Sequence, residues 1–181
     1  MTSQTFKTRV LTIAIIVMAS LSIQAQETGR TGQPSMQELI EQSLSKVQDF
    51  NPEALLNSIA EMKRIEAIFP DSVQPKYVMA LQSLNFAVMN PHAEQTENVL
   101  AGAKQAISQM EKMKGADPSD ICTLYGFLYM VRIVQDPAKN GQRYYLDVMQ
   151  NYEKALKLNP DNQLAKQLQE KFFEGMRKIE D

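Results

Sequence analysis

Apolar residues along most of the chain recur every three or four positions, which is the spacing of one face of an α-helix. In the first such segment, Leu39, Ile40 and Leu44 fall on one side. Alternating runs of Val, Ile and Thr, which would indicate half-buried strands, are missing from the sequence. The pattern therefore predicts an all-α protein.

Capping residues, prolines and a glycine divide this pattern into about seven helices. Ser35 with Glu38 has the order of a capping box, and Asn51 is a cap followed by a first-turn proline. Gly115 is a stop signal after a long helical run. The predicted helices start at Ser35 and at Asn51, and then cover Pro75–Val88, Ala93–Lys114, Ser119–Val134, Gln142–Leu158 and Asn162–Ile179.

Three of the predicted helices end at a proline in a shared context, which indicates an internal repeat of helix pairs. Pro70, Pro118 and Pro160 are each followed by a polar residue that can cap the next helix. A methionine or tyrosine lies at the same distance before each of these prolines. The helical-repeat domain is expected over 35–181, with repeats at about 35–70, 71–118 and 119–160 and a capping helix over 161–181.

Two further prolines interrupt the second and third repeats at nearly matching places. Pro91 and Pro137 lie at similar offsets from the prolines that open their repeats. We expect chain breaks over Asn90–Asn98 and Gln135–Gly141. Because equivalent breaks in stacked repeats map to one edge, these two segments should lie on the same side of the molecule.

The segment YEKALKLNPDN, which starts at Tyr152, resembles the end of a tetratricopeptide repeat. Tyr152, Ala155 and Pro160 match the aromatic residue, the small residue and the proline of that family at their usual spacing. Together with FPDSVQPKYVMAL and VRIVQDPAKNGQRYY, the segment resembles a group of exported, tetratricopeptide-like bacterial proteins. The resemblance implies a short right-handed solenoid of helix pairs, and the last helix, polar on one side, would be its C-terminal cap.

The N-terminus has the layout of a secretory signal peptide, with basic residues before a short apolar run. The exit SIQAQ predicts cleavage between Ala25 and Gln26. Residues 1–25 are therefore interpreted as the signal peptide and residues 26–34 as a flexible leader. An uncleaved anchor is the alternative, but the apolar run is short for the roughly 20 residues of a bilayer span. Cleavage predicts a periplasmic or secreted protein with no stable membrane span.

The composition of the chain argues against several kinds of binding site and catalytic site. The formal net charge of −2 gives no basic footprint for nucleic acid. Cys122 is the only cysteine and His92 the only histidine, so the sequence predicts no disulfide within the chain and no metal site. Cys122 is interpreted as a small buried hydrophobe and His92 as a solvated loop residue. The sequence therefore predicts no catalytic residue and no cofactor.

The segment ICTLYGFLYMVRIV carries the candidate binding residues. It is apolar on almost every side, so its helix is either buried between neighbours or faces a partner. Tyr125 and Tyr77 lie at equal distances after the prolines that open their repeats, and Tyr129 and Arg132 follow on about the same side as Tyr125. Tyrosine and arginine are common interface anchors. Because the first helix of each pair lines the concave face of tetratricopeptide solenoids, the resemblance implies a groove around these four residues.

The expected function is that of an exported, non-catalytic protein- or peptide-binding module, with an unidentified protein or peptide as its partner. A carrier of an apolar small molecule between the third and fifth predicted helices is the alternative. A closed apolar pocket would favour the carrier, and an open groove would favour the binding module. An enzyme that uses a pair of carboxylates is less favoured, because most carboxylates here alternate with Lys or Arg on solvated helix faces.

Overall fold

The computed structural model describes residues 34–47 and 51–180. The predicted cleavage site at Ala25 and Gln26 therefore lies outside the described residues. Within them, the chain forms seven α-helices and no strand, which confirms the all-α prediction. The helices are α2 (Met36–Ser45), α3 (Pro52–Ile68), α4 (Val73–Met89), α5 (Thr96–Met110), α6 (Pro118–Gln135), α7 (Pro137–Leu158) and α8 (Gln163–Glu180).

Hydrogen bonds of the predicted kind fix several helix ends. The backbone N–H of Ser35 donates to the Glu38 carboxylate at 2.7 Å, and the Ser35 side chain accepts from the Glu38 N–H, which completes the capping box before α2. The Asn51 side chain accepts from the N–H of Glu53 at 2.8 Å at the start of α3. Gly115 has a φ of 89°, which suits glycine, in the turn between α5 and α6.

The predicted break over Gln135–Gly141 is wrong. Helix α7 begins at Pro137, so only Asp136 separates it from α6. The Asp136 side chain accepts from the N–H of Lys139 at 3.1 Å and caps α7. Pro137 occupies the first turn, where its missing N–H leaves no helical hydrogen bond unmade. An Asp-Pro pair is a helix start signal, whereas the sequence interpretation treats this proline as a helix end.

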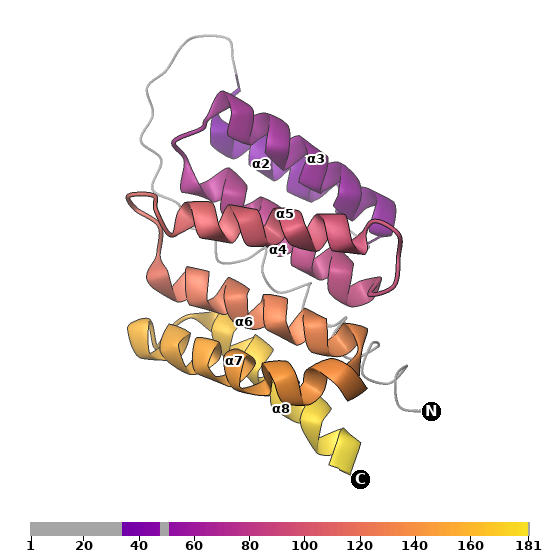
Figure 1. Cartoon of the computed structure of the whole chain (residues 1–181). Coiled ribbons are helices and arrows are strands. Elements are labelled where there is room, and N and C mark those ends of the chain that lie inside the picture. The colour runs from indigo at the N-terminus through magenta and orange to yellow at the C-terminus, as the bar shows by residue number, and fades with distance from the viewer. Residues whose placement is uncertain (1–33, 48–50, 181) are drawn as a thin grey trace.

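The connection between α4 and α5 and the connection between α6 and α7 nevertheless lie on the same side of the stack (Figure 1). Nε2 of Gln135, at the end of α6, donates to the carbonyl oxygen of Pro91 at 3.2 Å. Pro91 belongs to the connection between α4 and α5. The expectation that these two segments share one edge of the molecule is therefore confirmed.

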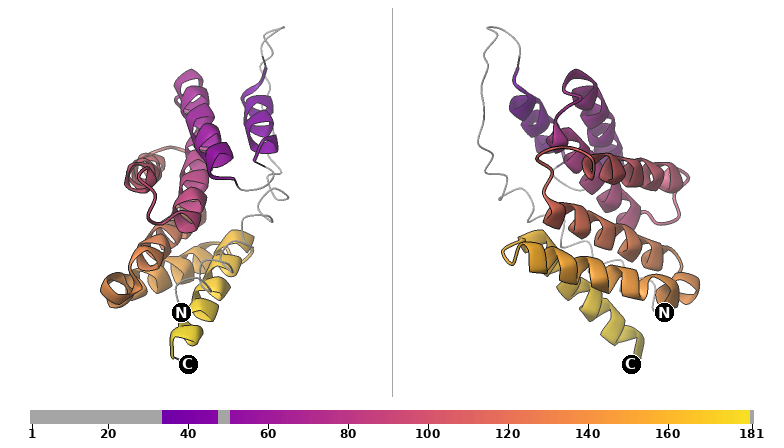
Figure 2. Two further views of the ribbon diagram at one scale, coloured as in Figure 1. Left: turned by 90° about the vertical axis from the view of Figure 1, so that its right-hand side faces the viewer. Right: turned by 60° about the vertical axis from the view of Figure 1, so that its left-hand side comes forward.

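The helices stack from α2 and α3 at one end to α7 and α8 at the other (Figures 1 and 2). Helix α4 packs against α3, α5 and α6, and α6 packs against α4, α5, α7 and α8. Because α4 and α6 have neighbours on several sides, they are buried almost all round. Helix α8 keeps one side exposed.

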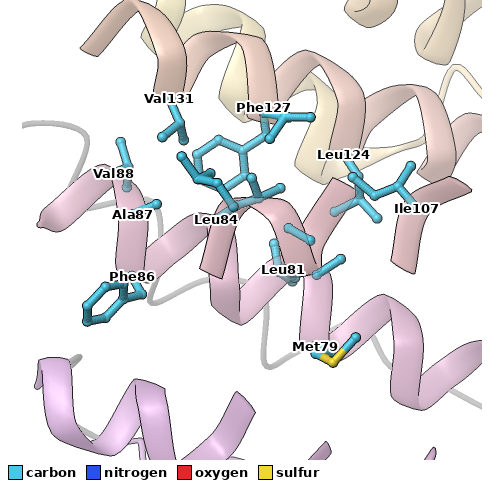
Figure 3. Close-up of a cluster of buried hydrophobic side chains, with 14 of the residues drawn as sticks. Met79, Leu81, Leu84, Phe86, Ala87, Val88, Ile107, Leu124, Phe127 and Val131 are labelled. Carbon is cyan, nitrogen blue, oxygen red and sulfur yellow. The ribbon is translucent and has the colours of Figure 1, made fainter. Parts of the chain in front are cut away.

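An apolar interface joins α4 to α6 in the middle of the stack. Leu124, Phe127 and Val131 of α6 face Leu81 and Leu84 of α4 (Figure 3), and none of these side chains is more than 5% exposed. Burying a side chain of this size contributes about 1.5–3 kcal/mol to stability. The two halves of the stack are thus held together by close apolar packing.

Gly126 allows α6 and α7 to approach each other closely. A Cβ atom at Gly126 would lie 2.6 Å from Cε1 of Tyr152, whose ring is fully buried. The hydroxyl group of Tyr152 lies 3.9 Å from the Sδ atom of Met130. The tyrosine of the repeat-like motif thus packs on the bare backbone of α6. This contact explains a glycine in mid-helix, where it costs about 1 kcal/mol relative to alanine.

Candidate functional site

Three half-buried tyrosine side chains form a stacked row on α6 and α7. The rings of Tyr125 and Tyr129 on α6 have centroids 6.4 Å apart and an interplanar angle of 21°. The rings of Tyr129 and Tyr144, the latter on α7, have centroids 5.6 Å apart, again at 21°. These distances lie in the range in which aromatic pairs attract each other. Tyr125, Tyr129 and Tyr144 are called the tyrosine row below.

The row follows from helix geometry and from the short α6–α7 turn. Tyr125 and Tyr129 are one helical turn apart, so their side chains lie on the same face. Helix α7 returns along α6 after Asp136 and brings Tyr144 beside Tyr129. The Cζ atom of Arg143 lies 5.1 Å from the centroid of the Tyr144 ring, which is a cation–π distance. The row therefore ends in a positive charge.

Neighbouring carboxylates affect the two tyrosines of α6. The Tyr125 hydroxyl donates to Oε2 of Glu111 at 3.1 Å. Burial, followed by the negative charge of Glu111, raises the pKa of Tyr125 to about 12. Burial also raises the pKa of Tyr129, and the charge of Asp147 adds to this effect. Both phenols are therefore neutral near pH 7.

Arg132 borders the row but is engaged in an ion pair with α5. Its Nη1 atom donates to Oε1 and Oε2 of Glu97 at 2.7 and 2.8 Å. The same atom donates to Oε1 of Gln135 at 2.9 Å, and Nε2 of Gln135 donates to Glu97 at 2.8 Å. Hydrogen bonds from Arg132 and Gln135 lower the pKa of Glu97. Arg132 thus ties α5 to the end of α6.

Tyr77 is not equivalent to Tyr125. Helix α4 begins after the proline that opens its repeat, whereas α6 begins at its proline, so Tyr77 lies about one turn nearer its helix start. Its half-buried side chain lies near the N-terminal end of α6. Burial, and then the charges of Asp120 and Asp117, raise the pKa of Tyr77. The structure therefore brings Tyr125, Tyr129 and Arg132 together along α6 and places Tyr77 at a different position.

The row is directed toward the second helices of the predicted pairs. Tyr125 bonds to Glu111, directly after α5, and Tyr129 stacks on Tyr144 of α7. In the expected solenoid, the concave face would be formed by the first helices of the pairs, α2, α4 and α6. The candidate site therefore lies on the α5 and α7 side of α6, whereas the resemblance implied the concave side.

Sequence reasoning missed Tyr144 and Arg143. Both residues fall in the first turn of the helix predicted over Gln142–Leu158, and the sequence interpretation gave them no role in the site. The Asp-Pro start signal at Asp136 would have placed Tyr144 about two turns into a longer helix. The stacking of Tyr144 on Tyr129 depends on how α7 packs against α6, and no local pattern reports this.

A polar cluster lies where α6, α7 and α8 meet. Nδ2 of Asn162 donates to Oγ of Ser119 at 2.9 Å and to Oδ1 of Asp120 at 3.0 Å. The Ser119 hydroxyl donates to the carbonyl oxygen of Ala155 at 2.8 Å. Oδ1 of Asn162 accepts from the N–H of Ala165 at 3.0 Å and so caps the start of α8. The polar groups of this cluster thus satisfy one another's hydrogen bonds, which is typical of a network with a structural role.

Asp120 is the carboxyl group of this cluster, and its surroundings disfavour its ionised form. Burial, and then the charge of Asp117, raise the pKa of Asp120 to about 6, while the hydrogen bond from Asn162 acts in the opposite direction. A carboxyl group that titrates near pH 6 has the acidity of a general acid or base. Its hydrogen-bond partner, however, is the side chain that caps α8. We therefore assign Asp120 to the junction between helices.

The lone cysteine and histidine have the surroundings that the sequence indicated. Cys122 is 6% exposed and packs with Ala155 and Ala165. Burial raises the pKa of its thiol, which disfavours the reactive thiolate. His92 is exposed in the connection between α4 and α5. Over residues 34–47 and 51–180, no group of three or more His, Cys, Asp or Glu side chains is placed to hold a metal ion.

An open, polar depression of about 340 Å³ lies between α2 and α3. Charges of both signs line it, and Lys46 pairs with Glu61 there at 2.8 Å. Its lining residues are Ser43, Lys46, Asn51, Glu53, Ala54, Asn57, Ser58, Ala60, Glu61 and Arg64. The α4–α6 interface, where a carrier would hold an apolar ligand, is occupied by the packed side chains of Figure 3.

In the described part of the chain, no helix combines the length and the apolar character that crossing a membrane requires. The chain was compared with protein-family models, with curated proteins and with solved structures, and none of the three comparisons found a match.

Proposed function

We propose that the protein is an exported, non-catalytic binding module for a protein or peptide. The tyrosine row is the observation that supports this function. Its rings are stacked, half exposed and anchored on two packed helices. Tyrosine offers a large, rigid contact area at low conformational-entropy cost, and it is common at the energetic centres of interfaces. A row that is already ordered has little freedom left to lose on binding.

We further propose that the helices form a short right-handed solenoid of tetratricopeptide-like pairs, with α8 as its cap. Helices α4, α6 and α8 pack in series, and α5 and α7 each pack against the helix before and the helix after them. Tyr152 and Ala155, which carry the resemblance, are fully buried. In this arrangement, the tyrosine row lies on the surface of α6 between α5 and α7.

The chemistry of the row favours a partner segment with apolar or aromatic side chains. Such side chains pack against the exposed edges of the stacked rings, and carboxylate or carbonyl groups of the partner reach the Arg143 guanidinium at the end of the row. No observation favours the carrier of an apolar small molecule, because the interface between α4 and α6 is filled by side chains.

Capture of partners from bacterial envelope extract tests this function. The immobilised wild-type protein and the Tyr129→Ala and Tyr144→Ala variants are compared, and retained proteins are identified by mass. Ile68→Ala is the matched control, since Ile68 is 63% exposed on α3, away from the row. We expect the control to retain the same proteins as wild type and the row variants to lose them. Equal retention by all variants, or no specific retention, would show that the row is not a binding site.

A further inference from the structure

The exposed residues of α8 that the structure describes lie in one row along the helix. The buried residues of α8 face α6 and α7. The exposed residues recur in alternating steps of three and four, so they share one face of the helix. They are Gln163, Lys166, Glu170, Phe173 and Arg177. These five residues are called the α8 stripe.

A large aromatic side chain interrupts this polar stripe. Phe173 is 37% exposed, and its ring lies 6.3 Å from that of Phe172, which is buried against Tyr145 of α7. Leu146, the residue after Tyr145, is 64% exposed. Helices α7 and α8 form one end of the stack (Figures 1 and 2). The end of the stack thus presents apolar groups on both of its last two helices.

The charges of the stripe are arranged for pairing with a second α8. Glu170 and Arg177 lie on opposite sides of Phe173 at nearly equal spacing along the helix. When two copies of α8 run antiparallel and cross at Phe173, Glu170 of each copy lies opposite Arg177 of the other. A parallel arrangement would place like charges together. If one copy slid along the other by one helical turn, Lys166 of each copy would lie opposite Arg177 of the other, and like charges would meet.

We propose that the α8 stripe is a two-fold interface through which two copies of this chain form a dimer. The two Phe173 rings pack on each other at the centre, and two Glu170–Arg177 pairs flank them. Such an interface is isologous, because the same surface of each copy is used. One helix face buries less surface than a standard interface, so the dimer is weak and its population depends on concentration. This inference does not depend on the proposed binding function.

Charge reversal tests the interface because it predicts both disruption and rescue. Full-length chain is expressed in an export-competent bacterium, and the purified protein is studied by sedimentation equilibrium from about 1 µM to about 500 µM. We expect Glu170→Arg and Arg177→Glu each to weaken dimerisation by about tenfold or more, because like charges then face each other twice. The double variant should regain the wild-type affinity within about threefold.

Two controls complete the experiment. Phe173→Ser should weaken dimerisation without changing the far-UV circular dichroism, because the side chain is partly exposed. Glu41→Arg reverses an exposed charge on α2, at the opposite end of the stack, and should leave the dimer intact. A wild-type monomer over the whole range, an assembly larger than a dimer, or a double variant that stays monomeric would each overturn the proposal.

Discussion

At the scale of single residues, the contact between Gly126 and Tyr152 fixes how closely α6 and α7 pack. We expect Gly126→Ala to destabilise the protein by about 1–3 kcal/mol, because the new Cβ atom would lie 2.6 Å from a rigid, buried ring. This loss should exceed the gain of about 1 kcal/mol in helix propensity. Urea denaturation followed by circular dichroism measures the difference.

A glycine in open space supplies the control for this substitution. Gly102 lies in α5, and a Cβ atom added there would meet no neighbouring group within 4 Å, so Gly102→Ala should leave stability unchanged or raise it. If Gly126→Ala is as harmless as Gly102→Ala, the close approach of Tyr152 does not limit the packing. Combining Gly126→Ala with Tyr152→Leu should recover part of the lost stability, because the smaller side chain leaves room for the methyl group.

Tyr129 and Leu124 lie on the same helix in different surroundings. Leu124 is fully buried, whereas Tyr129 is half exposed in the tyrosine row. Leu124→Ala should cost about 2–5 kcal/mol through the cavity that it leaves. Tyr129→Ala should cost about 1–2 kcal/mol, chiefly through lost stacking on its two neighbours. Chemical denaturation compares them, and equal losses would mean that Tyr129 is a core residue and that the proposed site should be abandoned.

At the scale of helices, the junction of α6 and α8 makes stability depend on pH. The pKa of Asp120 rises from 3.8 to about 6 in the folded protein, so folding favours its protonated form. Its contribution to stability is therefore fully present below about pH 4 and is lost as the pH rises through 6. Between pH 7 and 5, where Glu38, Glu61 and Glu97 stay ionised because their pKa values are lowered, acidification should stabilise the fold.

Asp120→Asn tests this dependence directly. The amide cannot ionise, but its oxygen still accepts the hydrogen bond from Asn162. We expect the variant to be more stable than wild type at pH 7.5 by about 1–2 kcal/mol, after allowance for partial solvent screening. The advantage should shrink as the pH falls below 6. Melting curves from pH 4.5 to 8 check this prediction, and an advantage that is independent of pH would contradict it.

The presence of the helices could be predicted from the sequence, because the residues that start and end a helix act locally. The capping box at Ser35 and the Asn-Pro start at Asn51 depend on neighbours within one turn, and both occur in the structure. The start of α7 at Pro137 was missed because proline opens helices as well as ending them. The same ambiguity shifted the register between repeats and made Tyr77 seem equivalent to Tyr125.

At the scale of the whole molecule, we expect the mature protein to begin at Gln26. The reason is the short apolar run followed by the exit SIQAQ, which is typical of a cleaved signal peptide. The measurement is the intact mass of protein recovered from the cell envelope after expression of the full-length chain. Recovery of the full-length mass would mean that the N-terminal segment is kept as an anchor. Ala25→Leu should slow the cleavage, since a small residue is required there.

Only the part of the candidate site that lies on α6 could be predicted from the sequence. Spacing placed Tyr125, Tyr129 and Arg132 on one side of α6, and the structure agrees. The contributions of other helices, Tyr144 to the row and Glu97 to the ion pair, depend on tertiary packing. Position along the sequence does not encode these partners, which lie 15 and 35 residues away from Tyr129 and Arg132.

The single-residue turn at Asp136 bears on the order in which the chain folds. Helices α6 and α7 pack along each other although only one residue separates them, so their contacts close short loops and cost little chain entropy. This hairpin should therefore form early and be largely present in the folding transition state. Val148→Ala, at a fully buried position of α7, should slow folding, whereas Leu55→Ala in α3 should mainly speed unfolding. Stopped-flow kinetics would distinguish the two effects.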